Sequence, residues 1–349
     1  MEIRLINDAI GWRSALAKIG RYECYHTWDF HRIDTNGSNG SESFFALQVK
    51  SADSVLFLPV VARKIPDSNL RDLRSVYGYP GPVYVGAPED FTPLLEAAFS
   101  KLRQMGFVSF FSRCSAFSTA RMVEPPACYF RTSKLVTIDL CLPADAQWRQ
   151  YRENLRRDIN HAIESGLQCQ QASQHDGPAF LELYHRTMNR VAAQSHYYLD
   201  QNYLSTMLAS RDFDCRLYVC KDDGRIISAA LFLFCNGIVQ YHLSGSDANY
   251  SKFGASKLLI DYVRRTAAQE GFEILCLGGG LGGRADHLYN FKRGFTKKEE
   301  DFYLIKKVLD PAAYNRLLAA QQRNAAETSA FFPAYRQPAP VQETVHRTA

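Results

Sequence analysis

A lysine that follows a glycine-rich run is the most reactive combination in the sequence. The run Leu277–Gly283 holds five glycines in seven residues, and Lys292 follows it, next to Phe291. An ammonium group held beside such a loop can stabilise a developing oxyanion or protonate a leaving group. The alternative is a surface lysine whose stem covers apolar neighbours. The run lacks the Lys-Ser or Lys-Thr of a P-loop and the long following helix of a dinucleotide fingerprint, so nucleotide binding is not indicated.

A second candidate site is the start of a helix expected over Ser251–Glu270, which follows a strand expected over Val239–Ser244. Backbone N–H groups and the helix dipole favour an anion such as phosphate there. Gly254 allows a ligand close to the backbone, and Lys252 adds positive charge; the alternative is a permissive turn without a ligand. The residues assigned to this site are Leu243, Ser244, Ser251, Lys252, Phe253, Gly254, Ala255 and Ser256.

Two further groups of residues are candidates for substrate binding. Tyr77 and Tyr79, in a turn-rich segment, line an acceptor cleft or form a rigid turn packed on the core. Arg149, Arg152 and Arg156 lie at helical spacing and face tRNA or an acceptor diphosphate. For the arginines, the alternative is an ordinary solvated helix face.

The composition bounds the class of protein. The chain has 349 residues, 46% of them hydrophobic, which predicts about two globular domains. A net charge of +5 allows a local phosphate site but gives no sign of DNA binding. Nine scattered cysteines without a C-x-x-C pair favour neither a disulfide framework nor a zinc site. We find no signal peptide and no apolar run of transmembrane length, so we expect a cytoplasmic protein.

The hydrophobic pattern predicts mixed sheets with helices packed on them. In the first half, Phe44–Val49 and Ser54–Ala62 read as a hairpin and Thr92–Met105 as a helix. From Leu135 the pattern becomes strand, helix, helix, helix, strand, strand, strand, helix, strand, helix, strand, the first of these helices being capped by Asp145. We expect domains over 1–133 and 134–310, then a C-terminal helix and disordered tail over 311–349, because the residues after about Gln321 are rich in Ala, Gln, Thr and Pro.

Several motifs, taken in order, resemble the FemAB family, which is related to the GNAT N-acyltransferases. The motifs are Tyr25-His26-Thr27, Ser75-x-Tyr77-Gly78-Tyr79-x-Gly81-Pro82, Thr187-Met188-x-Arg190, His196-Tyr197-Tyr198, Tyr241-His242-Leu243-Ser244-Gly245, Leu277-Gly278-Gly279-Gly280 and Phe291-Lys292-x-x-Phe295. The resemblance covers about residues 20–310 and is strongest from Gln240 to Phe295. It implies an α/β (α+β) fold of two tandem GNAT-like domains, with mixed sheets flanked by helices and a cleft between the domains.

The resemblance also implies roles for particular residues. Phe291 and Lys292 lie at the donor ester, where the lysine assists transfer; substrate is expected at Tyr77, Tyr79, Tyr197, Tyr198, Arg156, Gly279 and Gly280. GNAT enzymes bind the CoA pyrophosphate through [R/Q]-x-x-G-x-[G/A], for which this chain has Ser251 to Ser256, with Ser251 in place of the Arg or Gln. Because no Cys-His or Ser-His-Asp grouping is recognisable, transfer is expected to be direct. The candidates for the base are His242, Asp286 and His287; a strand histidine bonded to a neighbour is the alternative for His242.

These observations predict an amide-forming N-acyltransferase. The donor is acyl-CoA, slightly favoured over aminoacyl-tRNA, and the acceptor is an amine on a small molecule or on a lipid- or sugar-linked precursor of the cell envelope, a polysaccharide or a natural product. We expect no tightly bound cofactor and no metal. The alternative from another class is a catalytically silent module that binds a glycan or a precursor.

Overall fold

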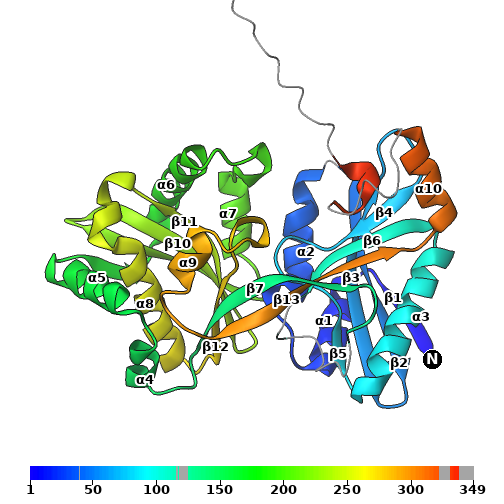
Figure 1. The fold of residues 1–349 in the computed structure, drawn as a ribbon, viewed down its shortest axis with the longest axis horizontal. Helices are drawn as coiled ribbons and strands as arrows, with labels where there is room; N and C mark the ends of the chain where they lie inside the picture. Colours follow the sequence, from blue (N-terminus) through cyan, green and yellow to red (C-terminus); the bar gives the residue numbers. More distant parts are fainter. Residues whose placement is uncertain (39, 115–116, 118–124, 322–330, 338–349) are drawn as a thin grey trace, which may run out of the picture.

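The computed structural model describes residues 1–349 except 39, 115–116, 118–124, 322–330 and 338–349. Its described strands form a mixed 13-stranded sheet that runs through both halves of the chain (Figure 1). The strand order is β1-β2-β3-β4-β6-β13-β7-β12-β11-β10-β9-β8, with β5 paired to β3. Helices cover the sheet on both faces.

The first half contains the expected hairpin and helix. Its main elements are β1 (Glu2–Ile6), α1 (Ala9–Ile19), α2 (Trp28–Thr35), β2 (Glu42–Ser51), β3 (Ser54–Lys64), β4 (Arg71–Arg74), β5 (Val83–Val85), α3 (Phe91–Gln104) and β6 (Phe107–Cys114). β2 and β3 pair in antiparallel register from Glu42↔Arg63 to Ser51↔Ser54. The apolar face of α3, including Leu94 and Leu102, is buried against these strands.

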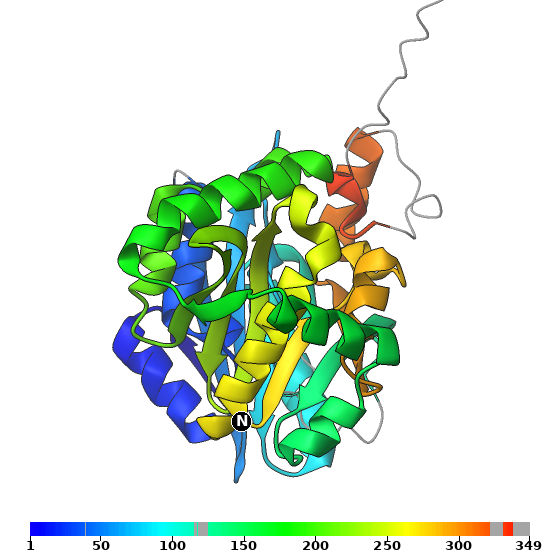
Figure 2. The same ribbon diagram turned by 90° about the vertical axis from the view of Figure 1, so that its left-hand side faces the viewer.

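The second half follows the predicted order of elements, except that β8 was not predicted and the first predicted helix is divided into α4 and α5. They are β7 (Tyr129–Asp139), α4 (Ala144–Arg149), α5 (Glu153–Glu164), β8 (Gln168–Gln171), α6 (Gly177–Arg190), α7 (Gln201–Leu208), β9 (Asp214–Asp222), β10 (Arg225–Cys235), β11 (Ile238–Ser246), α8 (Ala255–Gln269), β12 (Ile274–Gly278), α9 (His287–Lys292), β13 (Glu299–Val308) and α10 (Pro311–Ala320). Alternate residues of β10 separate two cores. Phe232 packs with α5 and α8, whereas Leu231 packs with α6 and α7. Figure 2, with this half toward the viewer, shows α8 in yellow in front of the strands.

The expectation of a single helix capped by Asp145 at the start of this half was wrong. The segment is broken into α4, which begins after Pro143, and α5, for which Arg152 is the N-cap in an extended conformation. The backbone N–H of Arg152 donates to the carbonyl of Gly294 (2.8 Å), so a tertiary contact takes the donor that a continuous helix would use internally. The three arginines therefore do not form one helical stripe: Arg149 lies on α4 and Arg156 on α5.

The two halves share their central strands. β13 pairs with β6 of the first half, as in Tyr303↔Cys114, and with β7, as in Glu299↔Val136. The expected boundary between residues 133 and 134 falls inside β7. A chain segment from near the C-terminus thus closes the sheet of the first half.

Part of the expected disordered tail is ordered. Residues 331–337 pack on the first half, where the hydroxyl of Tyr335 donates to Asp72 (3.0 Å) and lies 2.7 Å from the Ser109 hydroxyl. Arg336 also pairs with the fully buried carboxylate of Asp72. The composition favoured disorder, but a buried charge that needs partners outweighs it. The remaining tail residues, 322–330 and 338–349, lie outside the described part of the chain.

Candidate active site

Two neighbouring parallel strands diverge at the centre of the second half. β11 and β12 pair at Ile238↔Ile274, Val239↔Leu275 and Gln240↔Cys276, and the ladder ends there. Beyond this point β11 continues through His242 to Ser246, and β12 runs into the glycine loop. Past the end of this ladder, the backbone N–H and C=O groups of β11 and β12 no longer pair with each other. The sequence predicts that Lys292 lies beside this glycine loop.

Lys292 ends the short helix α9 and its ammonium reaches back to the glycine loop. The side-chain Nζ donates to the carbonyl of Gly279 (2.7 Å), and the residue is only 7% exposed. Burial lowers the pKa of Lys292 to about 8, while the nearby Cys276 and Asp286 oppose that shift. A surface lysine is therefore excluded, and the amine exchanges its proton near physiological pH.

A glycine is required at position 278 by the close approach of Lys292 and Tyr79. Gly278 has φ +78°, and a Cβ at this position would lie 2.9 Å from the Tyr79 hydroxyl and 3.3 Å from Lys292 Nζ. A Cβ on Gly280 would collide with the carbonyl of Arg284. The backbone N–H of Gly279 donates to the Tyr79 hydroxyl (3.4 Å). The loop thus presents bare backbone to two polar side chains.

The candidate bases Asp286 and His287 lie at the start of α9. Asp286 is the N-cap: its carboxylate accepts from the backbone N–H groups of Tyr289 and Leu281, each at 2.9 Å. Burial opposes ionisation of Asp286, but these backbone donors outweigh it and lower its pKa. His287 is exposed. Asp286 therefore shapes the loop that holds Lys292.

His242 is the extra residue of a β-bulge. β11 and β10 pair at Tyr241↔Phe232 and at Leu243↔Leu231, so no residue of β10 stands opposite His242. Its Nε2 lies 3.1 Å from the Tyr203 hydroxyl, and its buried Nδ1 has no hydrogen-bond partner among the described residues. Burial lowers the pKa of His242 to about 3, so the ring is neutral at physiological pH.

An aromatic group from the first half adjoins these residues. The Tyr25 ring lies 5.9 Å from that of Tyr79 and 6.2 Å from that of His242. The Tyr77 ring, 45% exposed as a residue, is 6.0 Å from the His242 ring. The structure thus brings together side chains of both halves around Lys292 and His242.

The other predicted substrate residues occupy separate places. The carbonyl of Tyr197 accepts from the Tyr184 hydroxyl (2.9 Å), and Tyr198, which is 39% exposed, donates to Asn189 (2.6 Å). Phe291 packs its ring 5.7 Å from that of Phe295, on the core of the second half.

The predicted phosphate site starts later than expected. Ala248–Phe253 form a 3₁₀ helix, and α8 begins only at Ala255, because Gly254 is left-handed (φ 72°, ψ 15°). The helix was expected to begin at Ser251, because the spacing of apolar residues does not reveal this break. Lys252 is exposed, with Nζ 5.4 Å from the Phe253 ring, and the Ser256 hydroxyl lies 3.0 Å from that of Ser228. Leu243 and Ser244 pair with β10, and the side chain of Ser251 lies outside the described part.

Helix α5 covers the start of α8. A Cβ on Gly254 would lie 2.9 Å from the carbonyl oxygen of Asp158, whose carboxylate pairs with Lys257 at 2.5 Å. One turn earlier on α5, Leu155 lies 3.5 Å from the place where a Cβ on Gly294, just after Lys292, would stand. The α8 start and the Lys292 segment therefore lie against the same short stretch of α5. No sequence pattern indicates Asp158 and Lys257, because their pairing depends on this packing.

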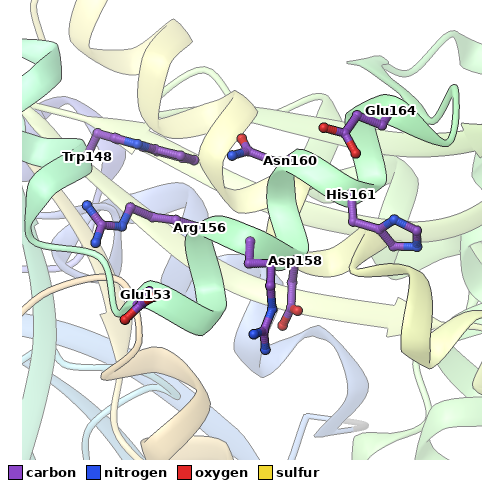
Figure 3. A pocket seen from close by; sticks show the side chains of 8 residues that line it. Trp148, Glu153, Arg156, Asp158, Asn160, His161 and Glu164 are labelled. Carbon is purple, nitrogen blue, oxygen red and sulfur yellow. The ribbon is translucent and has the colours of Figure 1, made fainter.

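Arg156 lies on the outer face of α5. It lines an open depression together with Trp148 of α4 and other polar side chains of α5 (Figure 3). The lining residues are Trp148, Glu153, Arg156, Arg157, Asp158, Asn160, His161 and Glu164. Acidic and basic groups alternate here, so the depression is not a uniformly cationic surface.

Among the described residues, no group of three or more His, Cys, Asp or Glu side chains is placed to hold a metal ion. No helix in the described ranges is long and apolar enough to cross a bilayer.

Comparisons with known proteins agree with this architecture. Residues 149–293 match the acetyltransferase (GNAT) domain family. No curated protein matches the chain. The structure of FemX is similar with a TM-score of 0.68 and 11% identity, over 90% of this chain and 99% of that one.

Two other solved structures share the fold. The C-terminal domain (DUF2156) of a putative lysylphosphatidylglycerol synthetase from Agrobacterium fabrum has a TM-score of 0.53 and 15% identity, covering 90% of this chain and 96% of its own. A conserved protein of unknown function from Bacteroides thetaiotaomicron has a TM-score of 0.52 and 11% identity, covering 87% and 99%. The predicted α/β fold and the resemblance to FemAB and GNAT-type proteins are confirmed.

Proposed function

Because residues 149–293 carry a GNAT-type acetyltransferase domain within a FemX-like fold, we propose that the chain is an amide-forming N-acyltransferase. It transfers an acyl group from an activated donor, with acyl-CoA favoured, to an amine on a small molecule or on a lipid- or sugar-linked acceptor. The observation that carries this proposal is the buried Lys292 ammonium against the glycine loop, at the point where β11 and β12 diverge.

The reaction needs positioning and charge stabilisation more than a nucleophile. The acceptor nitrogen forms a bond to the donor carbonyl carbon, and the π electrons move onto the carbonyl oxygen. Lys292 faces that oxygen and stabilises its negative charge, an interaction strengthened by the burial of the lysine. The carbonyl re-forms as the bond to the leaving thiol or hydroxyl breaks. The candidates for the base that takes the amine proton remain His242, Asp286 and His287, and burial, which lowers the pKa of His242 to about 3, makes its ring a weak proton acceptor in this structure.

The start of α8 bears on the identity of the acyl donor. The α8 start supports acyl-CoA, because a helix N-terminus suits a pyrophosphate. One observation weighs against acyl-CoA: the Asp158 carboxylate pairs with Lys257 in the first turn of α8 and opposes another anion there, which keeps aminoacyl-tRNA as the alternative donor. Thermal shift with CoA, acetyl-CoA and charged tRNA separates the two. Stabilisation by charged tRNA alone would remove acyl-CoA.

Lys292 substitutions test the proposal. We expect Lys292→Met to lower kcat at least about 100-fold, the usual cost of one oxyanion donor, with little change in ligand affinity. Because the pKa of Lys292 is about 8, wild-type activity should fall as pH rises through that value, and Lys292→Arg should move the fall to higher pH.

The matched control is Lys18→Met, an exposed lysine on α1. The assay incubates the full chain with acetyl-CoA or charged tRNA and a panel of amines, including an amino sugar and a lysine peptide, and detects the amide by mass spectrometry. A fully active Lys292→Met variant would refute the proposed mechanism. Binding of the panel ligands without any turnover would favour the silent binding module.

A further inference from the structure

A tyrosine of the first half reaches into the Lys292 site. Tyr79 belongs to the segment between β4 and β5, yet its hydroxyl lies against Gly278 and Gly279 of the second half. Its ring is held edge-on by Tyr25 (5.9 Å) and by Phe302 of β13 (5.4 Å). The ring is therefore fixed by residues of both halves, and its hydroxyl has a defined position.

The hydrogen bonds of the Tyr79 hydroxyl determine what this group can donate to a ligand. A phenol has one proton to donate and lone pairs to accept with. The Gly279 N–H donates to the oxygen, which uses a lone pair and leaves the proton of the hydroxyl to be given elsewhere. No acceptor for that proton is found among the described residues. Burial raises the pKa of Tyr79 well above its usual value, so the proton stays on the oxygen throughout the physiological range.

Tyr79 and Lys292 share one space above the glycine backbone. A single point, the position of an absent Cβ on Gly278, is 2.9 Å from the Tyr79 oxygen and 3.3 Å from Lys292 Nζ. The two groups are therefore close enough for one oxygen atom of a ligand to meet both donors. A side chain at position 278 would press on both groups, which gives Gly278 a steric reason beside its positive φ.

We propose that Tyr79 is a second catalytic residue of the acyl transfer, which donates a hydrogen bond to the same carbonyl oxygen as Lys292. This inference rests on the proposed function. As the C–N bond forms, the carbonyl π pair moves to oxygen and both donors hold that charge. When the carbonyl re-forms, the bond to the leaving group breaks, and the proton lost by the amine ends on that group. Tyr79 keeps its own proton throughout.

The proposal explains why the two halves must stay together. Lys292 comes from the second half and Tyr79 from the first, and the continuous sheet through β13 fixes one against the other. The donor carbonyl is then bound between the halves, with Tyr77 on the same turn toward the acceptor side near His242.

Tyr79→Phe tests the role, because it removes the hydroxyl and keeps the ring that packs on Tyr25 and Phe302. We expect kcat to fall about 100- to 1000-fold with KM changed less than about threefold, as for the loss of one oxyanion donor. The alkaline limb near pH 8 should remain in this variant, since it belongs to Lys292. Tyr22→Phe, a half-buried tyrosine of the first half, serves as control and should keep wild-type kinetics.

The outcomes separate this inference from the proposed function. The assay is the acetyl-CoA and charged-tRNA amine panel, with Tm measured for each variant. If wild type is active and Lys292→Met is not, while Tyr79→Phe keeps kcat within threefold, Tyr79 is not catalytic and only this inference fails. If wild type forms no amide with either donor, the proposed function fails first. A fall in kcat with Tm within about 2 °C of wild type supports the catalytic role, whereas a large rise in KM alone overturns it.

Discussion

At the scale of single residues, Lys292 is held at the cost of stability. Its ammonium is buried with one backbone carbonyl as hydrogen-bond acceptor, and burial lowers its pKa to about 8. A buried cation without a carboxylate partner destabilises the folded state, so its presence indicates a functional rather than a structural role. The sequence showed the lysine and the glycines, and only the structure showed that the lysine is buried.

We expect Lys292→Met to stabilise the protein at neutral pH by about 1–3 kcal/mol, because each pKa unit corresponds to about 1.4 kcal/mol. The folded-state pKa is lower than the unfolded value, so between about pH 8 and 10.5 the unfolded chain binds the extra proton and wild-type stability rises with pH. The variant should lack that rise. Urea unfolding at pH 7 and at pH 9.5 measures both effects, and a destabilised variant at pH 7 would contradict the argument.

At the scale of elements, α5 sets what the start of α8 can bind. It places the Asp158 carboxylate beside Lys257 in the first turn of α8 and its earlier turn against the Lys292 segment. Periodicity predicted one long helix here, because Trp148, Tyr151 and Leu155 recur at helical spacing. The break at Arg152 depends on a hydrogen bond to Gly294 that no local pattern can indicate.

If acyl-CoA is the donor, Asp158→Asn should bind CoA about two- to fivefold more tightly. The change removes a partly exposed negative charge worth up to about 1 kcal/mol from the place of the pyrophosphate and frees Lys257. Isothermal titration with CoA measures it, with Glu164→Gln of the same depression as control. Equal affinity in wild type and variant would mean that the pyrophosphate does not lie at α8.

At the scale of the whole molecule, the halves share one continuous sheet. β13 supplies hydrogen bonds to β6 and to β7, so unfolding of one half removes a strand partner from the other. Residues 331–337 add a further long-range contact through Asp72. Composition and motif order predicted two side-by-side domains, but strand pairing between distant segments is decided by tertiary packing.

We expect a single cooperative unfolding transition. Trp12 and Trp28 report on the first half and Trp148 on the second. Fluorescence of a Trp148→Phe variant should therefore give the same urea midpoint as far-ultraviolet circular dichroism of the entire chain. Two separate midpoints, with the first half unfolding alone, would show that β13 does not couple the halves.

The sequence by itself determined most of the helices and strands, the glycine loop, Lys292 and the acyltransferase resemblance, because periodicity, glycine content and motif spacing are properties of neighbouring residues. Tertiary structure decided which groups meet. Tyr79 and Gly279 are 200 residues apart, and the pairing of Asp158 with Lys257 joins two helices. Such contacts form only when the sheet closes through β13 and the helices pack on it, and their energies depend on burial that no local stretch of sequence records.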